Sequence, residues 1–190
     1  MNRREFLKTL ALTGVAATLK WDGMMDLMAQ GVPGSATGCD LVAVMGGEPA
    51  AMFRKAIGEF GGMGKFVKAG QKVVVKPMGI VWDRGFFHKN DLQQCIADIC
   101  TMDKPAVLNV VDAYRMMKTN GPRGKSDADV VTTKSLFVST DIVAVDTAAT
   151  KFFNQIEKMP LEVVGHLAKG EELKIGTMNI DSLQVERIKM

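Results

Sequence analysis

The chain has 190 residues, of which 47% are hydrophobic and 24% are charged, and its formal net charge is +3. This length suffices for one globular domain with a buried core, and the charged fraction is ordinary for such a domain. Lysine and arginine are scattered and aromatic residues make up only 6%. The composition therefore predicts no nucleic-acid partner, which would need a basic footprint or aromatic stacking platforms.

Residues 1–36 have the features of an export signal rather than of a folded domain. Arg3 and Arg4 stand in the run Asn-Arg-Arg-Glu-Phe-Leu-Lys, and a modestly apolar run follows at 9–19, too short to span a bilayer. We expect this leader to direct the protein through the twin-arginine pathway to a periplasmic or other extracytoplasmic location; an amphipathic N-terminal helix is the alternative. We expect residues 37–190 to form one domain without a transmembrane span.

The rest of the chain alternates between strand and helix patterns. Apolar periodicity and turn residues predict strands at 40–45, 72–76, 106–111, 135–139 and 183–189, and helices at 48–60, 91–102, 141–154 and 160–169, with a loop at 78–90. Such alternation is typical of a parallel sheet covered on both faces. We therefore predict an α/β fold with a mostly parallel sheet, helices on both faces and an edge strand at the C-terminus.

Polar residues follow three of the predicted strands: Lys76, Asp112 and Asp141. In a parallel sheet these strand ends share one edge, where open α/β folds bind their ligands. A lysine beside carboxylates could bind an anion and a divalent cation together, or serve acid–base chemistry; a structural ion-pair network with Asp141 as a helix cap is the alternative. The candidate cofactor-binding residues are Lys76, Asp112, Asn120, Gly121, Asp141 and Asp146.

The chain has three cysteines and two histidines. An odd cysteine count without Cys-x-x-Cys spacing is no disulfide framework, and Cys95 and Cys100, five residues apart, point about 140° from each other on a helix. We take Cys95 and His88 as candidate metal ligands. The alternative interpretation of Cys95 is a buried apolar side chain. We expect His166 on a helix surface. The cofactor stays open, with an iron–sulfur cluster or a divalent metal as candidates.

The sequence resembles the domain of unknown function 362 family. The motifs that carry the resemblance are KVVVKP at 72–77, VVDA at 110–113, TNGPRG at 119–124, ADV at 128–130 and STDIVAVD at 139–146. The resemblance implies export by a twin-arginine leader and an association with iron–sulfur proteins, but no settled reaction. Met78 stands where members usually have Asn, and only residues 78–85 replace their long central segment, which indicates a short form.

Two functions follow from these observations. The first is an exported α/β protein that binds an anionic small molecule or a metal or iron–sulfur cofactor at the C-terminal edge of the sheet, with a redox-associated role. The second is a non-catalytic binding or assembly protein, a shortened relative that has lost the active site. Lys76, Asp112 and Asp141 favour the first, and Met78 favours the second. Whether the chain is an enzyme stays open. A small sheet that lacks a segment is also expected to pair with another copy as a homo-oligomer.

Overall fold

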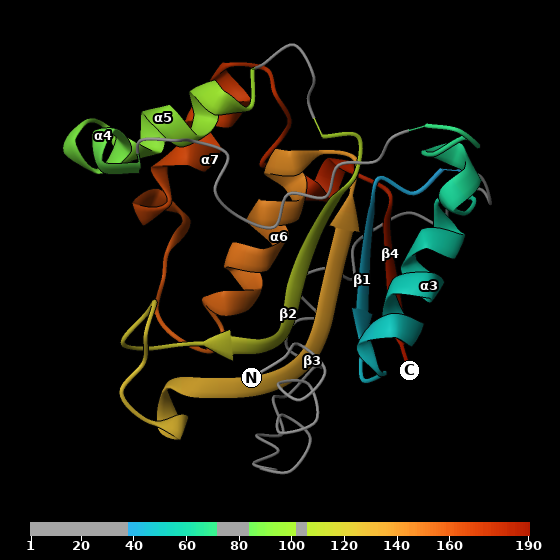
Figure 1. Ribbon diagram of the computed structural model, residues 1–190, viewed down its shortest axis with the longest axis horizontal. Helices are drawn as coiled ribbons and strands as arrows, with labels where there is room; N and C mark the ends of the chain where they lie inside the picture. Colours follow the sequence, from blue (N-terminus) through green and yellow to red (C-terminus); the bar gives the residue numbers. More distant parts are fainter. Residues whose placement is uncertain (1–37, 72–83, 102–105) are drawn as a thin grey trace.

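The computed structural model describes residues 38–71, 84–101 and 106–190. Their strands form one four-stranded sheet in the order β2-β3-β1-β4, and helices lie on both of its faces (Figure 1). The strands are β1 (Leu41–Met45), β2 (Asn109–Met117), β3 (Val130–Ser139) and β4 (Val185–Lys189); the helices are α3 (Pro49–Glu59), α4 (Arg84–Lys89), α5 (Leu92–Ile99), α6 (Ile142–Phe153) and α7 (Gly165–Glu172); and single 3-10 turns lie at Met63–Lys65, Asp127–Asp129, Leu161–Val163 and Ile180–Ser182.

The sheet is mixed. β1 and β4 are parallel, whereas β3 is antiparallel to both β1 and β2. The prediction of a mostly parallel sheet is therefore wrong. The predictions of helices on both faces and of a C-terminal strand at the edge of the sheet are confirmed. The physical reason lies in residues 118–129, which contain only a 3-10 turn. A parallel pair needs a crossover that carries the chain back along the sheet, usually through a helix, and this short segment instead reverses the chain as a hairpin.

Each face of the sheet has its own apolar core. α3 covers one face, where Met52, Ala56 and Ile57 pack on Val42 and Val44 of β1. The other face is covered by α6, whose buried side chains pack on the opposite face of β1 and β3. Because both faces are covered, β1 reads as a continuous apolar run rather than an alternating one.

A second helical layer lies beyond α6. α7 packs against both α6 and α5, and α4 packs against α5, which places this group at the upper left of Figure 1. The close approach of α7 to α6 depends on Gly170, because a Cβ there would lie 2.8 Å from Val143 Cγ2. Among the described residues, α6 therefore lies between this layer and the sheet.

Local sequence signals account for several helix starts. Asp91 caps α5 as predicted, since its carboxylate accepts a hydrogen bond of 3.0 Å from Gln94 N–H. Pro49 occupies the first turn of α3, where a missing N–H costs nothing.

Several element boundaries differ from the predictions. The helix expected at 160–169 is a 3-10 turn, Leu161–Val163, followed by α7. Residues 84–89 form a helix where a loop was expected. β2 continues past Asp112 to Met117, and β3 already begins at Val130. These extensions arise because the two strands pair along almost their whole length in the hairpin, so tertiary pairing overrides the weak strand signal of the polar residues there.

Several expectations fall outside the described residues: the leader at 1–36, the strand at 72–76 and its terminal Lys76, and Met78. Across the portions that are described, no helix combines the length and apolarity needed to cross a membrane.

Candidate functional site

The structure separates the polar residues that were expected to share one sheet edge. Asp141 follows β3, and Ser139 at the end of β3 pairs with Asn109 at the start of β2. Asn120 follows the opposite end of β2. The nine residues of β2 therefore lie between these two sites, and the eight steps from the first to the last of them span about 25 Å at roughly 3.3 Å per step. The expectation of a common edge is wrong, because the antiparallel pairing of β2 and β3 puts their carboxyl ends on opposite sides of the sheet.

Asp112 lies in the middle of β2 rather than at its end. Val111 and Ala113 belong to the core beneath α6, whereas Tyr114 packs with the core beneath α3. Alternation along the strand therefore puts Asp112 on the α3 face of the sheet. Its exposed carboxylate accepts a hydrogen bond of 2.9 Å from Tyr114 N–H. Asp112 is thus remote from α6, the helix that begins at Asp141.

Asp141 is built into the scaffold. One carboxylate oxygen accepts the N–H of Ala144 at 2.8 Å and caps α6, and the other accepts the N–H of Thr177 at 3.0 Å. A Cβ at Gly176 would overlap this carboxylate, so only glycine allows the 176–177 loop to approach so closely. Both oxygens are occupied by backbone donors. The helix-cap alternative of the sequence analysis is the geometry that the structure contains.

Asn120 and Gly121 belong to the loop between β2 and β3, which is organised by Asp129. The Asp129 carboxylate accepts hydrogen bonds from Thr119 Oγ1 at 2.6 Å and Asn120 Nδ2 at 2.7 Å. It also accepts the backbone N–H groups of Lys125 at 2.5 Å and Ser126 at 2.9 Å. The side chain of Asn120 is therefore committed to holding the loop.

Asp129 was not predicted as a candidate residue. It is only 4% exposed, and its four donors hold the pKa of its carboxyl well below the usual range, with the Thr119 hydroxyl the largest cause. The signal that could have revealed it is the Ser-x-x-Asp spacing of Ser126 and Asp129, which forms a reciprocal capping box. The loop is thus pinned from inside by one ionised carboxylate.

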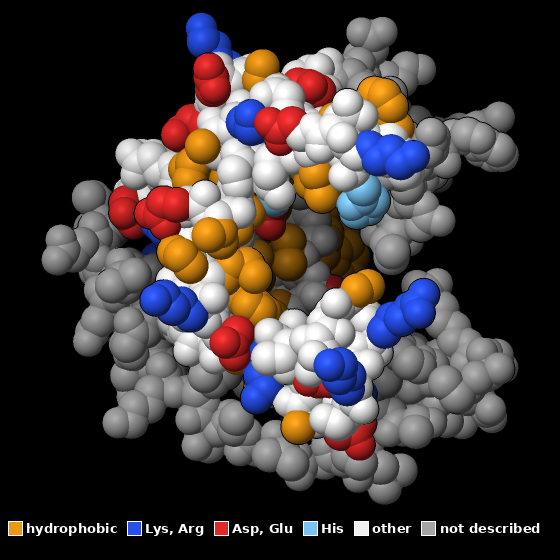
Figure 2. All heavy atoms as spheres, turned by 90° about the vertical axis from the view of Figure 1, so that its left-hand side faces the viewer, with side chains coloured by type: hydrophobic (Ala, Val, Ile, Leu, Met, Phe, Trp, Pro, Cys, Tyr) orange, Lys and Arg blue, Asp and Glu red, His pale blue; other side chains and the backbone are white. Residues whose placement is uncertain are grey.

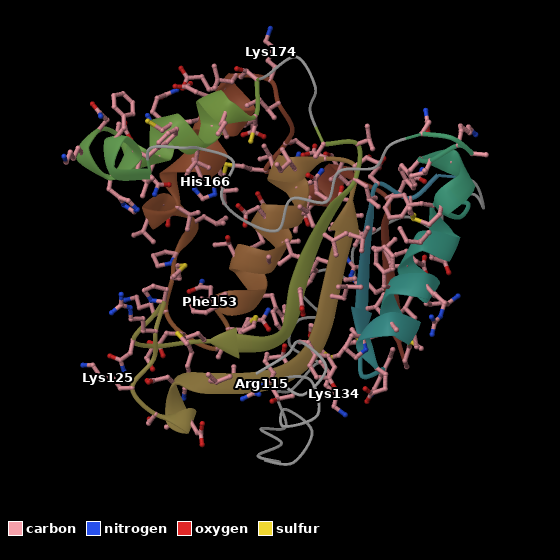
Figure 3. All side chains as sticks on the ribbon, viewed as in Figure 1. Arg115, Lys125, Lys134, Phe153, His166 and Lys174 are labelled. Atoms are coloured by element: carbon pink, nitrogen blue, oxygen red, sulfur yellow. The ribbon has the colours of Figure 1, made fainter. Side chains whose placement is uncertain are left out.

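The segment between β2 and β3 carries three cations, Lys118, Arg123 and Lys125, of which Lys118 is half-buried and the other two are exposed. None of them takes part in the ion pairs found within the described parts of the chain. The side chain of Lys125 points away from the body of the molecule (Figure 3). We name these three residues the hairpin cations.

The hairpin borders a hollow. Figure 2 shows that the face on the left of Figure 1 is hollowed between the α4, α5 and α7 layer above and the β2–β3 hairpin below. Hydrophobic side chains form the floor of this hollow, and Lys and Arg side chains stand along its lower rim among Asp and Glu side chains. An anionic ligand could contact the Lys and Arg side chains there.

Asp146 lies in a second place, on α6, together with His166 of α7. Asp146 Oδ2 lies 2.8 Å from His166 Nε2, and His166 Nδ1 lies 2.8 Å from Gln93 Oε1 of α5. The expectation that His166 is a surface residue is wrong, because its side chain is only 19% exposed. Both ring nitrogens face acceptors, so neither is available to take a proton from a substrate.

A cavity of about 60 Å³ adjoins this pair, with room for only a few non-hydrogen atoms. Burial and the charge of Asp146 raise the pKa of the Cys100 thiol, which therefore stays neutral and is a poor nucleophile. The lining residues are Ile96, Ala97, Cys100, Ile142, Val143, Asp146, His166, Leu167, Gly170 and Ile175.

The candidate metal ligands do not assemble. Within the described ranges, no three His, Cys, Asp or Glu side chains are arranged to hold a metal ion. The three cysteines are the only ones in the chain, and all are free: Cys39 donates to Glu59 O near the α3 core, and Cys100 donates to Ile96 O. His88 is exposed on α4, and Cys95 is half-buried on α5. The described residues therefore do not fit an iron–sulfur cluster.

The comparison with protein families agrees with the sequence motifs. Residues 73–151 match the family model described as domain of unknown function (DUF362). The resemblance to this family is confirmed. The DUF362 match includes β2, the hairpin loop, β3 and most of α6. It thus contains Asp129 and Asp146 but ends before His166. Searches among curated proteins and among solved structures find no match.

Proposed function

We propose that this chain is a non-catalytic binding protein that uses the hairpin loop at residues 118–126 to contact an anionic small molecule. The observation that carries the proposal is the loop itself. One buried carboxylate, Asp129, accepts four hydrogen bonds from the loop, while the hairpin cations form no ion pair among the described residues.

Rigidity supports this function. A flexible cationic loop loses conformational entropy when it binds, whereas a loop that is already fixed loses less. Arg115 adds a further cation to the same hairpin, and its Nε atom is enclosed without a hydrogen-bond partner among the described residues. An anion with several oxygen atoms, such as a diphosphate, could accept hydrogen bonds from several of these cations at once.

The non-catalytic part of the proposal rests on how the other polar residues are used. Asp141 spends both carboxylate oxygens on backbone N–H groups. His166 has acceptors at both ring nitrogens, and the raised pKa of Cys100 keeps that thiol neutral. Acid–base and nucleophilic catalysis need a group that can release or accept a proton toward a substrate, and these residues are committed elsewhere.

Calorimetric titration with inorganic pyrophosphate at low ionic strength tests the proposal. We expect saturable binding that weakens as salt is added, because exposed charges are screened. The variant Lys118→Gln/Arg123→Gln/Lys125→Gln should bind at least tenfold more weakly. The control Arg54→Gln/Lys65→Gln/Lys174→Gln removes the same charge from exposed positions elsewhere and should bind normally. Equal affinity in both variants, or no binding by the parent protein, would contradict the proposal.

A metal or iron–sulfur cofactor with a redox-associated role is the competing function. Metal analysis and the absorption spectrum of anaerobically purified protein decide between them. We expect a colourless protein without stoichiometric metal. A cluster spectrum that disappears in Cys95→Ser would support the cofactor and would require ligands from beyond the described residues or from a second copy.

We also propose export through the twin-arginine pathway, on the strength of Arg3, Arg4 and the modestly apolar run that follows. A fusion of residues 1–36 to a reporter that is active only outside the cytoplasm should be exported. The Arg3→Lys/Arg4→Lys fusion should stay inside. Export of both fusions alike would contradict this assignment. The expected homo-oligomer is checked by light scattering on the purified protein.

A further inference from the structure

We propose that His166 is a pH-dependent clasp that fastens α5 to α6 through α7 most firmly while both of its ring nitrogens carry protons. The clasp consists of Gln93 on α5, His166 on α7 and Asp146 on α6. α5 packs mainly on α7 and α4, so the clasp reaches from the outer helical layer to the helix that covers the sheet. His166 lies where these helices meet (Figure 3).

The donor and acceptor roles in the clasp follow from its geometry. The backbone N–H of His166 donates to Gln93 Oε1 at 2.9 Å, so this atom must be the amide oxygen and not the nitrogen. The same oxygen lies 2.8 Å from His166 Nδ1, so this contact is a hydrogen bond only when Nδ1 carries a proton. On the other side of the ring, Nε2 lies 2.8 Å from a carboxylate oxygen of Asp146, also an acceptor.

A neutral imidazole has only one N–H. If the proton sits on Nδ1, the lone pair of Nε2 faces the Asp146 carboxylate; if it sits on Nε2, the lone pair of Nδ1 faces the Gln93 oxygen. Only the imidazolium donates to both partners. The doubly protonated ring therefore favours the docked position of α5, and loss of one proton removes one of the two links.

Several other titratable groups lie on α7 and on the elements that pack against it. Carboxylic acids ordinarily titrate near pH 4 and lysine above pH 10. The raised pKa of Cys100 keeps that thiol neutral between pH 5.5 and pH 8. The groups on the elements packed against α7, and on α7 near His166, are Asp91, Asp98 and Cys100 from α5, Asp146 from α6, Glu162 from the Leu161–Val163 turn, and Lys169 from α7 itself, which pairs with Asp91 at 3.3 Å.

The sign of the effect follows from these roles. A group whose protonated form is favoured in the docked state contributes fully at low pH, and its contribution is lost as the pH rises. The docking of α5 should therefore weaken from pH 5.5 to pH 8. Asp146 is 43% exposed, so solvent screens the interaction, and we expect local opening of α5 to increase by roughly three- to tenfold.

Nitrogen-15 NMR of the histidine side chains tests the protonation states directly. At pH 5.5 both ring nitrogens of His166 should carry protons and show couplings to slowly exchanging hydrogens. His88, the second of the two histidines in the chain, is exposed and serves as the internal reference. A His166 ring with a single N–H at pH 5.5 would overturn the proposal.

Amide hydrogen exchange, normalised for the intrinsic rate at each pH, tests the consequence. Protection of α5 should fall by the stated factor between pH 5.5 and pH 8 in the parent protein and in His88→Gln. In His166→Gln and Asp146→Asn it should be independent of pH. For each variant, the protection of α5 at pH 8 is compared with the protection at pH 5.5 in the same variant. A loss of stability that is equal at both pH values therefore does not imitate the effect. The same pH dependence in His166→Gln and the parent protein would overturn the clasp.

Discussion

Asp141→Ala is the substitution that most sharply separates a structural role from a binding role. The alanine removes the cap of α6, which costs about 1 kcal/mol on average. It also leaves the N–H of Thr177 without its acceptor in a partly buried loop, which adds about 1–2 kcal/mol. We therefore expect the free energy of unfolding to fall by about 2–3 kcal/mol.

Urea denaturation followed by circular dichroism measures this loss. With an m-value of about 2 kcal/mol/M, the transition midpoint should fall by about 1–1.5 M. Asp141→Asn keeps one acceptor and should lose less than Asp141→Ala. The matched control is Asp112→Ala, because that carboxylate is exposed and accepts only the Tyr114 N–H. A midpoint for Asp141→Ala within 0.2 M of the control, a margin of roughly 0.4 kcal/mol at this m-value, would refute the structural account.

Three further predictions follow from the same contacts. Gly176→Ala should destabilise the protein as Asp141→Ala does, since its Cβ would displace the Asp141 carboxylate, and the double variant should show less than the sum of the two losses; additive losses would show that the positions are independent. Asp129→Asn should expose residues 118–126 to proteases at pH 7, because the amide has only one acceptor oxygen: if that oxygen keeps the Lys125 and Ser126 N–H groups, the new NH2 faces the Asn120 side-chain donor. In the parent protein the depressed pKa of Asp129 keeps the loop resistant above about pH 4, and this protection is lost only as the pH falls further. Unchanged cleavage of the variant would contradict the role of Asp129. Asp112→Asn should leave the urea midpoint nearly unchanged, and any ligand that it weakens must bind on the α3 face of the sheet; an unfolded variant would show that Asp112 is structural.

Local features of the fold were predictable because they depend on neighbouring residues. The apolar run of β1, the proline in the first turn of α3 and the Asp91 cap of α5 all appear as expected. The sheet direction was not predictable in the same way. Strand–helix alternation suggested parallel strands, but the polar segment between β2 and β3 reverses the chain. The composition of this segment does not indicate how many residues of β2 and β3 pair with each other.

The candidate site was harder to predict because strand direction decides which residues meet. A parallel sheet would have brought Asp112 and Asp141 to one edge, and one antiparallel pair was enough to separate them. His166 was underestimated since its partners, Gln93 and Asp146, are 73 and 20 residues away in the sequence. Contacts of that kind leave no periodic signal in a single sequence.

The most direct test of the proposed anion site is a pyrophosphate titration followed through the backbone amide resonances. Saturable shifts should cluster at residues 118–126, with no comparable change at Asp141 or Ala144, which lie about 25 Å away along β2. Shifts that cluster at the start of α6 instead, or that grow linearly without saturating, would contradict the account.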